Sequence, residues 1–221
     1  MKRVSKDPGG YGRLDRGVIV DAALRIAARP GVADIRVRDL GVELGADPSA
    51  VYRHFRNKAE IIAALIDRLM VDTTESLPVD QDWRGMLHAI AATALDTFVA
   101  HPAVGIHLTE ARSVGLGELR LVELGLRTLE DAGLSGDALV EHYSAYSGLL
   151  IAYVAAACRE RIAAELEDIP WIPASAEPTP EEFPALTRHA ERLFAMDYRS
   201  IYFASVRVLI DAVGRAAGES R

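Results

Sequence analysis

Cysteine is nearly absent from this chain: Cys158 is the single thiol among 221 residues. One thiol excludes an internal disulfide framework and fits a reducing compartment. Long apolar runs are missing as well, because the longest, Leu149 to Cys158, is far short of the roughly 20 residues that a membrane-spanning helix needs. Residues 1–13 are polar and basic, without the apolar core of a signal peptide. These absences predict a cytoplasmic protein with no membrane span.

Patterns that carry catalysis or bind metals are also missing. No glycine-rich phosphate loop follows a strand-like segment, and Ser144 and Ser147 lack the Gly-x-Ser-x-Gly setting of a hydrolase nucleophile. The six histidines form no compact ligand pattern, and no Cys-x-x-Cys occurs. We therefore predict no enzyme, no cofactor and no metal site.

What the chain does have is apolar and helix-forming residues. Half of its residues are hydrophobic, which is enough for a sizeable core and argues against disorder. Alanine, leucine and charged residues dominate, and alternating β-branched segments are few, so the composition predicts an all-α fold. The length suits one small module followed by a larger one.

Charge is divided unevenly along the chain. The net charge is −7, which alone would argue against binding to nucleic acid. Residues 1–58, however, hold 12 Lys and Arg against 7 Asp and Glu, whereas residues 59–221 hold 13 against 25. Since duplex DNA rewards local lysine and arginine through counterion release, the basic N-terminal part matters more than the total.

The segment 36–58, RVRDLGVELGADPSAVYRHFRNK, predicts two short helices joined by a tight turn. Leu40, Val42 and Leu44 supply apolar positions for the first helix. Gly45 stands where that helix should end, because glycine enters the left-handed conformation without a Cβ penalty. The pattern therefore places the turn at residues 45–47.

A second short helix is predicted to begin at Asp47 and to last about two turns. Asp47 offers an N-cap oxygen, and Pro48 fits the first turn because its missing N–H removes no bond. Val51 and Phe55 form its buried side. A polar, basic and aromatic outer face completes the signature of a helix-turn-helix.

These residues resemble the N-terminal domain of the tetracycline-repressor (TetR) family of transcriptional regulators. The resemblance runs from about Leu14 to about Leu69, and its most specific part is the run Tyr52-x-His54-Phe55-x-x-Lys58. Gly41 departs from the pattern, since such proteins more often carry alanine there. The resemblance implies an N-terminal three-helix domain with a helix-turn-helix over residues 1–58, followed by a larger helical ligand-binding and dimerisation domain over residues 59–221.

Eight residues are candidates for contact with DNA, six of them through the resemblance and two more, Arg38 and Lys58, from their places at the starts of helices. They are Arg38, Pro48, Ser49, Ala50, Tyr52, Arg53, His54 and Lys58. We expect Arg53 to read a base, because a guanidinium can bond guanine O6 and N7 together. Tyr52 and His54 suit phosphate contacts. Lys58 would add charge to a phosphate at the start of the next helix, which Asn57 can cap.

The rest of the chain predicts a helical body that encloses a pocket. Helices are expected after Lys58, after Asp82, around 103–111, and over about 117–133, 135–165, 185–196 and 198–217, with a proline-rich loop at 169–184. Mixed apolar and polar side chains could line a cavity between them. The candidates are Trp83, Phe98, His107, Tyr143, Tyr146 and Tyr153.

His107 resembles a position where tetracycline-responsive members of the family place a metal-binding histidine. Their other ligand-side histidine is matched here by Thr74, so tetracycline with magnesium is not the expected ligand. We interpret His107 as a polar residue of the pocket or of the core.

Two functions from different classes follow. The first is a homodimeric regulator, most often a repressor in this family, that binds a palindromic double-stranded DNA operator and is released by a small-molecule effector. Its dimer interface would be formed by the apolar middle of the long helix and by the last helix. The second is a helical small-molecule binding protein or enzyme whose N-terminal module no longer reads DNA.

Overall fold

The computed structural model describes residues 14–110, 115–163 and 179–218. Ten helices and no strand occur in these ranges, which confirms the all-α prediction. They are α1 (Arg16–Ala27), α2 (Val37–Leu44), α3 (Pro48–Val51), α4 (Lys58–Glu75), α5 (Trp83–Val99), α6 (Pro102–Gly105), α7 (Leu116–Asp131), α8 (Gly136–Ala163), α9 (Pro184–Phe194) and α10 (Tyr198–Ala216).

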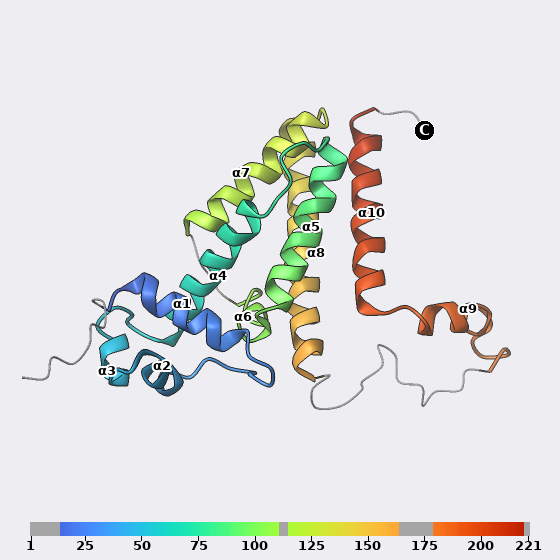
Figure 1. Cartoon of the computed structure of the whole chain (residues 1–221). Helices are drawn as coiled ribbons and strands as arrows, with labels where there is room; N and C mark the ends of the chain where they lie inside the picture. The colour runs from blue at the N-terminus through green and yellow to red at the C-terminus, as the bar shows by residue number, and fades with distance from the viewer. Residues whose placement is uncertain (1–13, 111–114, 164–178, 219–221) are drawn as a thin grey trace, which may run out of the picture.

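Helices α1, α2 and α3 gather at one end of the molecule, beside the start of α4 (Figure 1). Asp15 caps α1 by accepting a hydrogen bond from the Val18 N–H at 2.9 Å, as the sequence predicts. Side chains from all these helices are fully buried, including Ile19 of α1, Leu40 of α2 and Val51 of α3. This small core fixes how the helix-turn-helix is presented.

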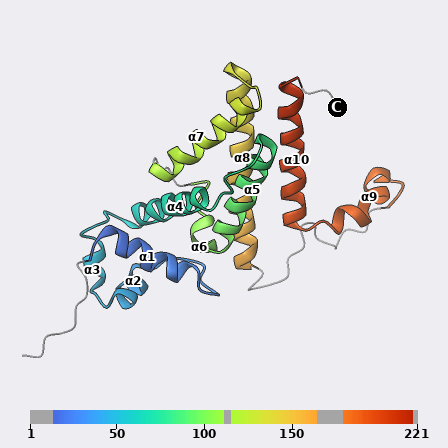
Figure 2. The ribbon, with the colours of Figure 1, turned by 45° about the horizontal axis from the view of Figure 1, so that its top comes forward.

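The body is built on α5, α8 and α10, which stand side by side in both views (Figures 1 and 2), with α7 packed across α4 and α8. Two buried tyrosine hydroxyls tie the outer helices to α5. Tyr146 of α8 donates to the Leu87 carbonyl, and Tyr202 of α10 donates to the Ala91 carbonyl at 2.9 Å. Because each buried hydroxyl finds a backbone partner, these aromatic residues cost the core no unsatisfied polar group.

Cys158 lies at the contact between α8 and α6. It is buried and free, and burial raises the pKa of its thiol to about 12, so it stays protonated and unreactive at neutral pH. A Cβ at Gly105 would lie 2.2 Å from its Sγ atom. Only a glycine therefore lets α6 lie this close to α8.

Helix α9 projects away from the body at the lower end of α10 (Figure 1), and none of its residues is buried. Phe183, Leu193 and Phe194 expose a third or more of their surface. Trp171 and most of the proline-rich segment, for which the sequence predicts a loop, lie outside the described residues.

Three local predictions were wrong. The helix after Asp47 has one α-helical turn, α3, instead of two, because the bonds that follow are of the tighter i→i+3 kind at Arg53 and His54. Helix α6 ends at Gly105 instead of continuing to about 111, and similar tight turns follow it. Val42 is 79% exposed, because two residues along a helix from the buried Leu40 lead to the opposite side.

Candidate DNA-binding surface and effector pocket

The turn between α2 and α3 is set by glycine and aspartate. Gly45 adopts the left-handed conformation at φ 60° and ends α2, as predicted. Asp47 accepts the Ser49 N–H at 2.8 Å, and Pro48 occupies the first turn of α3. A Cβ at Gly41 would lie 2.9 Å from the Ala46 carbonyl oxygen. The departure at Gly41 is thus explained by a turn that leaves no space for alanine.

The candidate DNA residues come from α2, α3, the turn after α3 and the start of α4. Arg38, Ser49, Tyr52 and Arg53 are exposed, whereas Pro48, Ala50, His54 and Lys58 are half-buried. Val51 and Phe55 are buried as predicted. The exposed members present two guanidinium groups and a phenol to solvent, whereas the Ser49 side chain is hydrogen-bonded to Asp47.

Lys58 already has a partner, because its Nζ forms an ion pair with Asp34. Asn57 caps the same helix end by accepting the Glu60 N–H at 2.9 Å, which confirms that predicted cap. A phosphate at this end of α4 would therefore have to compete with Asp34 for the lysine.

Arg16 of α1 joins the turn after α3 to α4, a role that the sequence did not reveal. Its guanidinium lies 4.1 Å from the centroid of the Phe55 ring. It also donates to the His54 carbonyl at 2.5 Å and to Glu60 Oε1 at 2.9 Å. Hydrogen bonds from the Arg56 N–H and from Arg16 lower the pKa of Glu60. These contacts hold the candidate reading turn rigidly against α1 and α4.

Helix α4 also joins the helix-turn-helix end to the body. Arg68 pairs with Asp21 of α1 at 3.0 Å. One residue earlier, Asp67 accepts the Gly117 N–H, in the first turn of α7, at 2.7 Å. A Cβ at Gly117 would lie 2.2 Å from the Asp67 carbonyl oxygen. The start of α7 therefore rests directly on the backbone of α4.

Replacing Gly117 by alanine should destabilise the protein by about 1–3 kcal/mol, the usual cost of an overpacked contact. The clash is with a backbone oxygen, so no side-chain rotation relieves it. Urea unfolding followed by circular dichroism measures the change. Gly17→Ala in α1 is the matched control, because its Cβ would meet only the flexible Asp15 side chain at 3.3 Å. Equal stability of the two variants would contradict the close contact.

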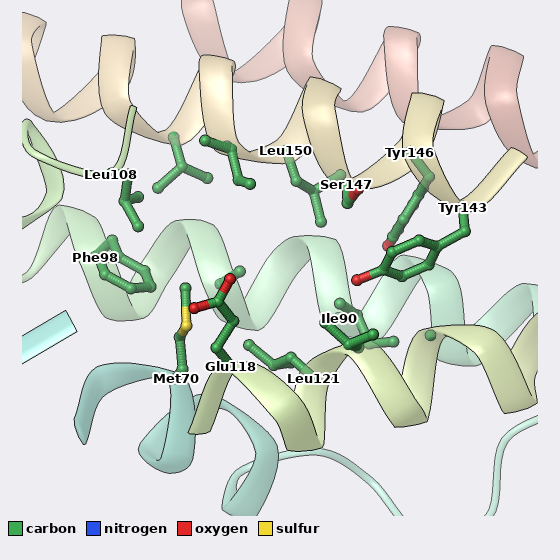
Figure 3. Close-up of a pocket in the computed structure, with 15 residues that line it drawn as sticks. Met70, Ile90, Phe98, Leu108, Glu118, Leu121, Tyr143, Tyr146, Ser147 and Leu150 are labelled. Carbon is green, nitrogen blue, oxygen red and sulfur yellow. The ribbon is translucent and has the colours of Figure 1, made fainter. Parts of the chain in front are cut away.

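A pocket of about 330 Å³ opens between α4, α5, α7 and α8 (Figure 3). It is lined by Met70, Ile90, Ala94, Phe98, Leu108, Glu118, Leu121, Val122, Gly125, Tyr143, Tyr146, Ser147, Leu150, Ile151 and Val154. Three of the predicted lining residues, Phe98, Tyr143 and Tyr146, are among them. The volume and the mostly apolar lining suit a small organic molecule.

The other three candidates lie elsewhere. Trp83 stacks under the Arg84 guanidinium, 4.3 Å from its ring centroid, at the start of α5. Tyr153 packs against the rings of Tyr198 and Tyr202 of α10, with centroids 5.6 and 5.9 Å away. Seven residues, about 10 Å along α8, separate it from Tyr146, and its ring meets α10 in place of the pocket.

His107 precedes a lining residue without lining the pocket itself. Its Nδ1 lies 3.7 Å from Glu110 Oε2, and its Nε2 is buried with no hydrogen-bond partner among the described residues. No group of three His, Cys, Asp or Glu side chains within the described ranges could hold a metal ion.

Among the lining residues that the sequence did not predict, Glu118 is the one that carries a charge. It shares one helical face with Leu121, Val122 and Gly125, at spacings of three, four and seven residues, and this periodicity was the available signal. Burial, and then the charge of Asp67, raises the pKa of its carboxyl. Burial and the charge of Glu118 raise the pKa of Tyr143.

Comparison with known families now places these features. Residues 19–65 match the family described as bacterial regulatory proteins, tetR family, and residues 77–211 match the tetracyclin repressor-like C-terminal domain. The chain belongs to the TetR family. The helix-turn-helix and the helical body that follows it are those of this family of transcriptional regulators, which confirms the resemblance.

Among relatives of this TetR-family regulator, the class A tetracycline repressor from transposon 1721 of Escherichia coli is 31% identical over 130 residues. These cover 58% of this chain and 60% of the repressor. The chain thus spans about 60% of the length of the curated relatives that it matches.

Two solved structures show the same fold over nearly the whole chain. A proposed transcriptional regulator from Streptomyces coelicolor A3(2) is 27% identical, with a TM-score of 0.76, over 93% of this chain and 100% of that one. ActR of Streptomyces coelicolor in complex with actinorhodin is 18% identical, with a TM-score of 0.75, over 94% and 100%. In the described part of this TetR-family chain, no helix is long and apolar enough to span a membrane.

Proposed function

We propose that this TetR-family protein is a homodimeric repressor that binds a near-palindromic operator and is released by a small, largely apolar effector. The observation that carries the proposal is the position of α4. Its first residues follow the candidate reading turn, and Met70, further along, lines the pocket. One helix is therefore in contact with both sites. The repressors among its relatives support the same function.

On the DNA side, residues 1–58 would form the reading module and residues 59–221 the sensing body. Arg53 would bond a guanine edge, and Arg38 would be the second base or phosphate contact. Tyr52, His54 and the start of α4 at Lys58 would bond phosphates, and Ala50 could touch a thymine methyl. Pro48 and Ser49 would approach the backbone at the start of α3.

The proposed dimer uses the outer faces of α8 and α10. On α8, Ser144, Ala145, Gly148 and Ala152 form an exposed stripe of small residues. On α10, Val208 is 64% exposed, and Ile201, Ser205 and Ala212 lie on the same side at helical spacing. Small residues allow helices to approach closely, so two copies would pack α8 and α10 into a four-helix interface. Two reading modules would then face half-sites spaced by one or more helical turns, about 34–36 Å each.

Release would follow from movement of α4. An effector that binds better to a spacing of the two reading modules that does not fit the operator shifts the protein towards that spacing. Operator affinity then falls by at most the ratio of the effector's affinities for the two spacings. The contact between Asp67 and Gly117 gives α7, which lines the pocket, a direct way to act on α4. The complex of ActR with actinorhodin, on the same fold, supports the binding of a small molecule by this fold.

The test is fluorescence anisotropy with the palindromic fragments upstream of the protein's own gene, and a scrambled fragment as the control. We expect sub-micromolar binding that depends on sequence. Affinity should also fall by about 10³–10⁵ between 50 and 200 mM salt if 6–10 phosphates are contacted. Binding that ignores the sequence would contradict the proposal and favour a small-molecule binding protein whose N-terminal module no longer reads DNA.

A further inference from the structure

The described lining of the pocket contains an acid and no base. Among its described lining residues, Glu118 is the only carboxylate, and none is lysine, arginine or histidine. The other polar groups are the hydroxyls of Tyr143, Tyr146 and Ser147. The Tyr146 hydroxyl is already donated to the Leu87 carbonyl. The remaining lining is aliphatic or aromatic, so Glu118 fixes the electrostatic character of the pocket.

Glu118 points into the pocket from the first turn of α7, between Met70 and Leu121 (Figure 3). No hydrogen bond or ion pair joins its carboxylate to another described residue. The nearby helix end does not satisfy it either, since the Gly117 N–H is donated to Asp67. Burial and the like charge of Asp67 both make the ionised form less stable than in water, as the raised pKa of Glu118 records.

A half-buried carboxylate without a partner among the described residues, in an apolar pocket, favours a ligand that brings the missing positive charge. We propose that the effector is a lipophilic molecule carrying a protonated amine, with its ammonium group against Glu118 and its apolar body between Ile90, Phe98 and Leu150. This inference rests on the proposed effector function of the pocket. An anionic molecule of the same shape would be repelled by Glu118 and by Asp67 behind it.

The volume of the pocket and a second group of polar side chains in it restrict the class of effector further. About 330 Å³ accommodates a molecule of roughly three fused rings. The Tyr143 and Ser147 side chains lie together on α8, across the pocket from Glu118 (Figure 3). A hydroxyl of the ligand can donate to their oxygens, because the Ser147 hydroxyl is itself donated to the Ser144 carbonyl at 3.4 Å. The expected effector is therefore a polycyclic amine with a polar group at the end remote from its nitrogen.

Three fluorescent probes of similar shape test the charge preference in the absence of DNA. They are 9-aminoacridine, which is a cation at neutral pH, the neutral 9-methylanthracene, and the anion 9-anthracenecarboxylate. Titrated against the full chain, the cation should bind about tenfold more tightly than the neutral probe, as a charge-assisted contact provides. The anion should bind most weakly.

Two variants assign the preference to one residue. Glu118→Gln keeps the shape of the side chain, so it should reduce affinity for 9-aminoacridine about tenfold and leave 9-methylanthracene unchanged. Glu123→Gln removes an exposed carboxylate from the same helix outside the pocket and should change neither affinity.

The outcomes separate this inference from the proposed function. If the neutral probe binds, but the cation has no advantage or keeps its advantage in Glu118→Gln, the charge assignment is overturned and the effector pocket stands. If no probe binds, the effector pocket and this inference fail together. Operator affinity of the same preparation then shows whether the DNA-binding part of the proposed function survives.

Discussion

Arginine in place of Gly148 should give a folded protein that is monomeric and binds its operator at least about 100-fold more weakly. Gly148 lies in the middle of the small-residue stripe of α8, and a Cβ added there meets nothing within 4 Å in a single subunit. The longer side chain therefore fits the monomer. In the proposed dimer it would place a charge between two closely packed α8 helices.

The size of this effect comes from linking two reading modules. Joining two binding sites raises overall affinity by about 10²–10⁴ over one site alone, and a monomer loses that gain. Light scattering after gel filtration gives the subunit count, circular dichroism reports the fold, and anisotropy gives the affinity. Leu119→Arg, at an exposed apolar residue of α7, is the control and should stay dimeric. A dimeric Gly148→Arg variant would place the interface on another face.

Arg53→Ala should lower specific operator affinity by roughly 30-fold to 10⁴-fold. A guanidinium that bonds both acceptors of a guanine contributes about 1–3 kcal/mol, and a dimer makes the contact twice. The side chain is exposed, so its truncation leaves the core intact. Anisotropy with the operator and with a scrambled fragment measures both affinity and specificity.

Arg53→Lys distinguishes base reading from a simple charge contact. Lysine keeps the positive charge but loses the planar fork. It should bind the scrambled fragment as the unchanged protein does, and lose most of its preference for the operator. If neither variant changes operator choice, the turn after α3 does not read bases. In that case the double variant Tyr52→Phe with Arg53→Ala should also leave operator choice unchanged.

The sequence predicted the ends of helices well where the signal is local. Asp15, Asp47 and Asp82 each accept an N–H within the first turn of their own helix, and Gly45 ends α2 in the left-handed conformation. A cap needs only its neighbours along the chain, so its chemistry is visible in the sequence. The length of α3 was not predicted, because the same few residues can form either the i→i+4 bonds of an α-helix or the i→i+3 bonds of a tighter turn.

The pocket was predicted less well because it depends on which helices meet. Tyr146 and Tyr153 lie seven residues apart on α8 and look equivalent in periodicity. One reaches α5 through Leu87, whereas the other stacks on α10. Arg16 and Asp67 were missed for the same reason, since their partners lie 38–50 residues away in the chain. Contacts between residues so far apart in the chain depend on tertiary packing, and they produce no periodic pattern in the sequence.

The contact between Asp67 of α4 and Gly117 of α7 is made by other groups than those that would recognise the effector. It is built from a backbone N–H, a backbone carbonyl, a glycine and one carboxylate, none of which lines the pocket. The side chains that do line it, on α5, α7 and α8, can be exchanged without altering that contact. Substitutions in the lining of such a pocket can therefore change which effector it binds, while the operator and the turn that reads it stay the same.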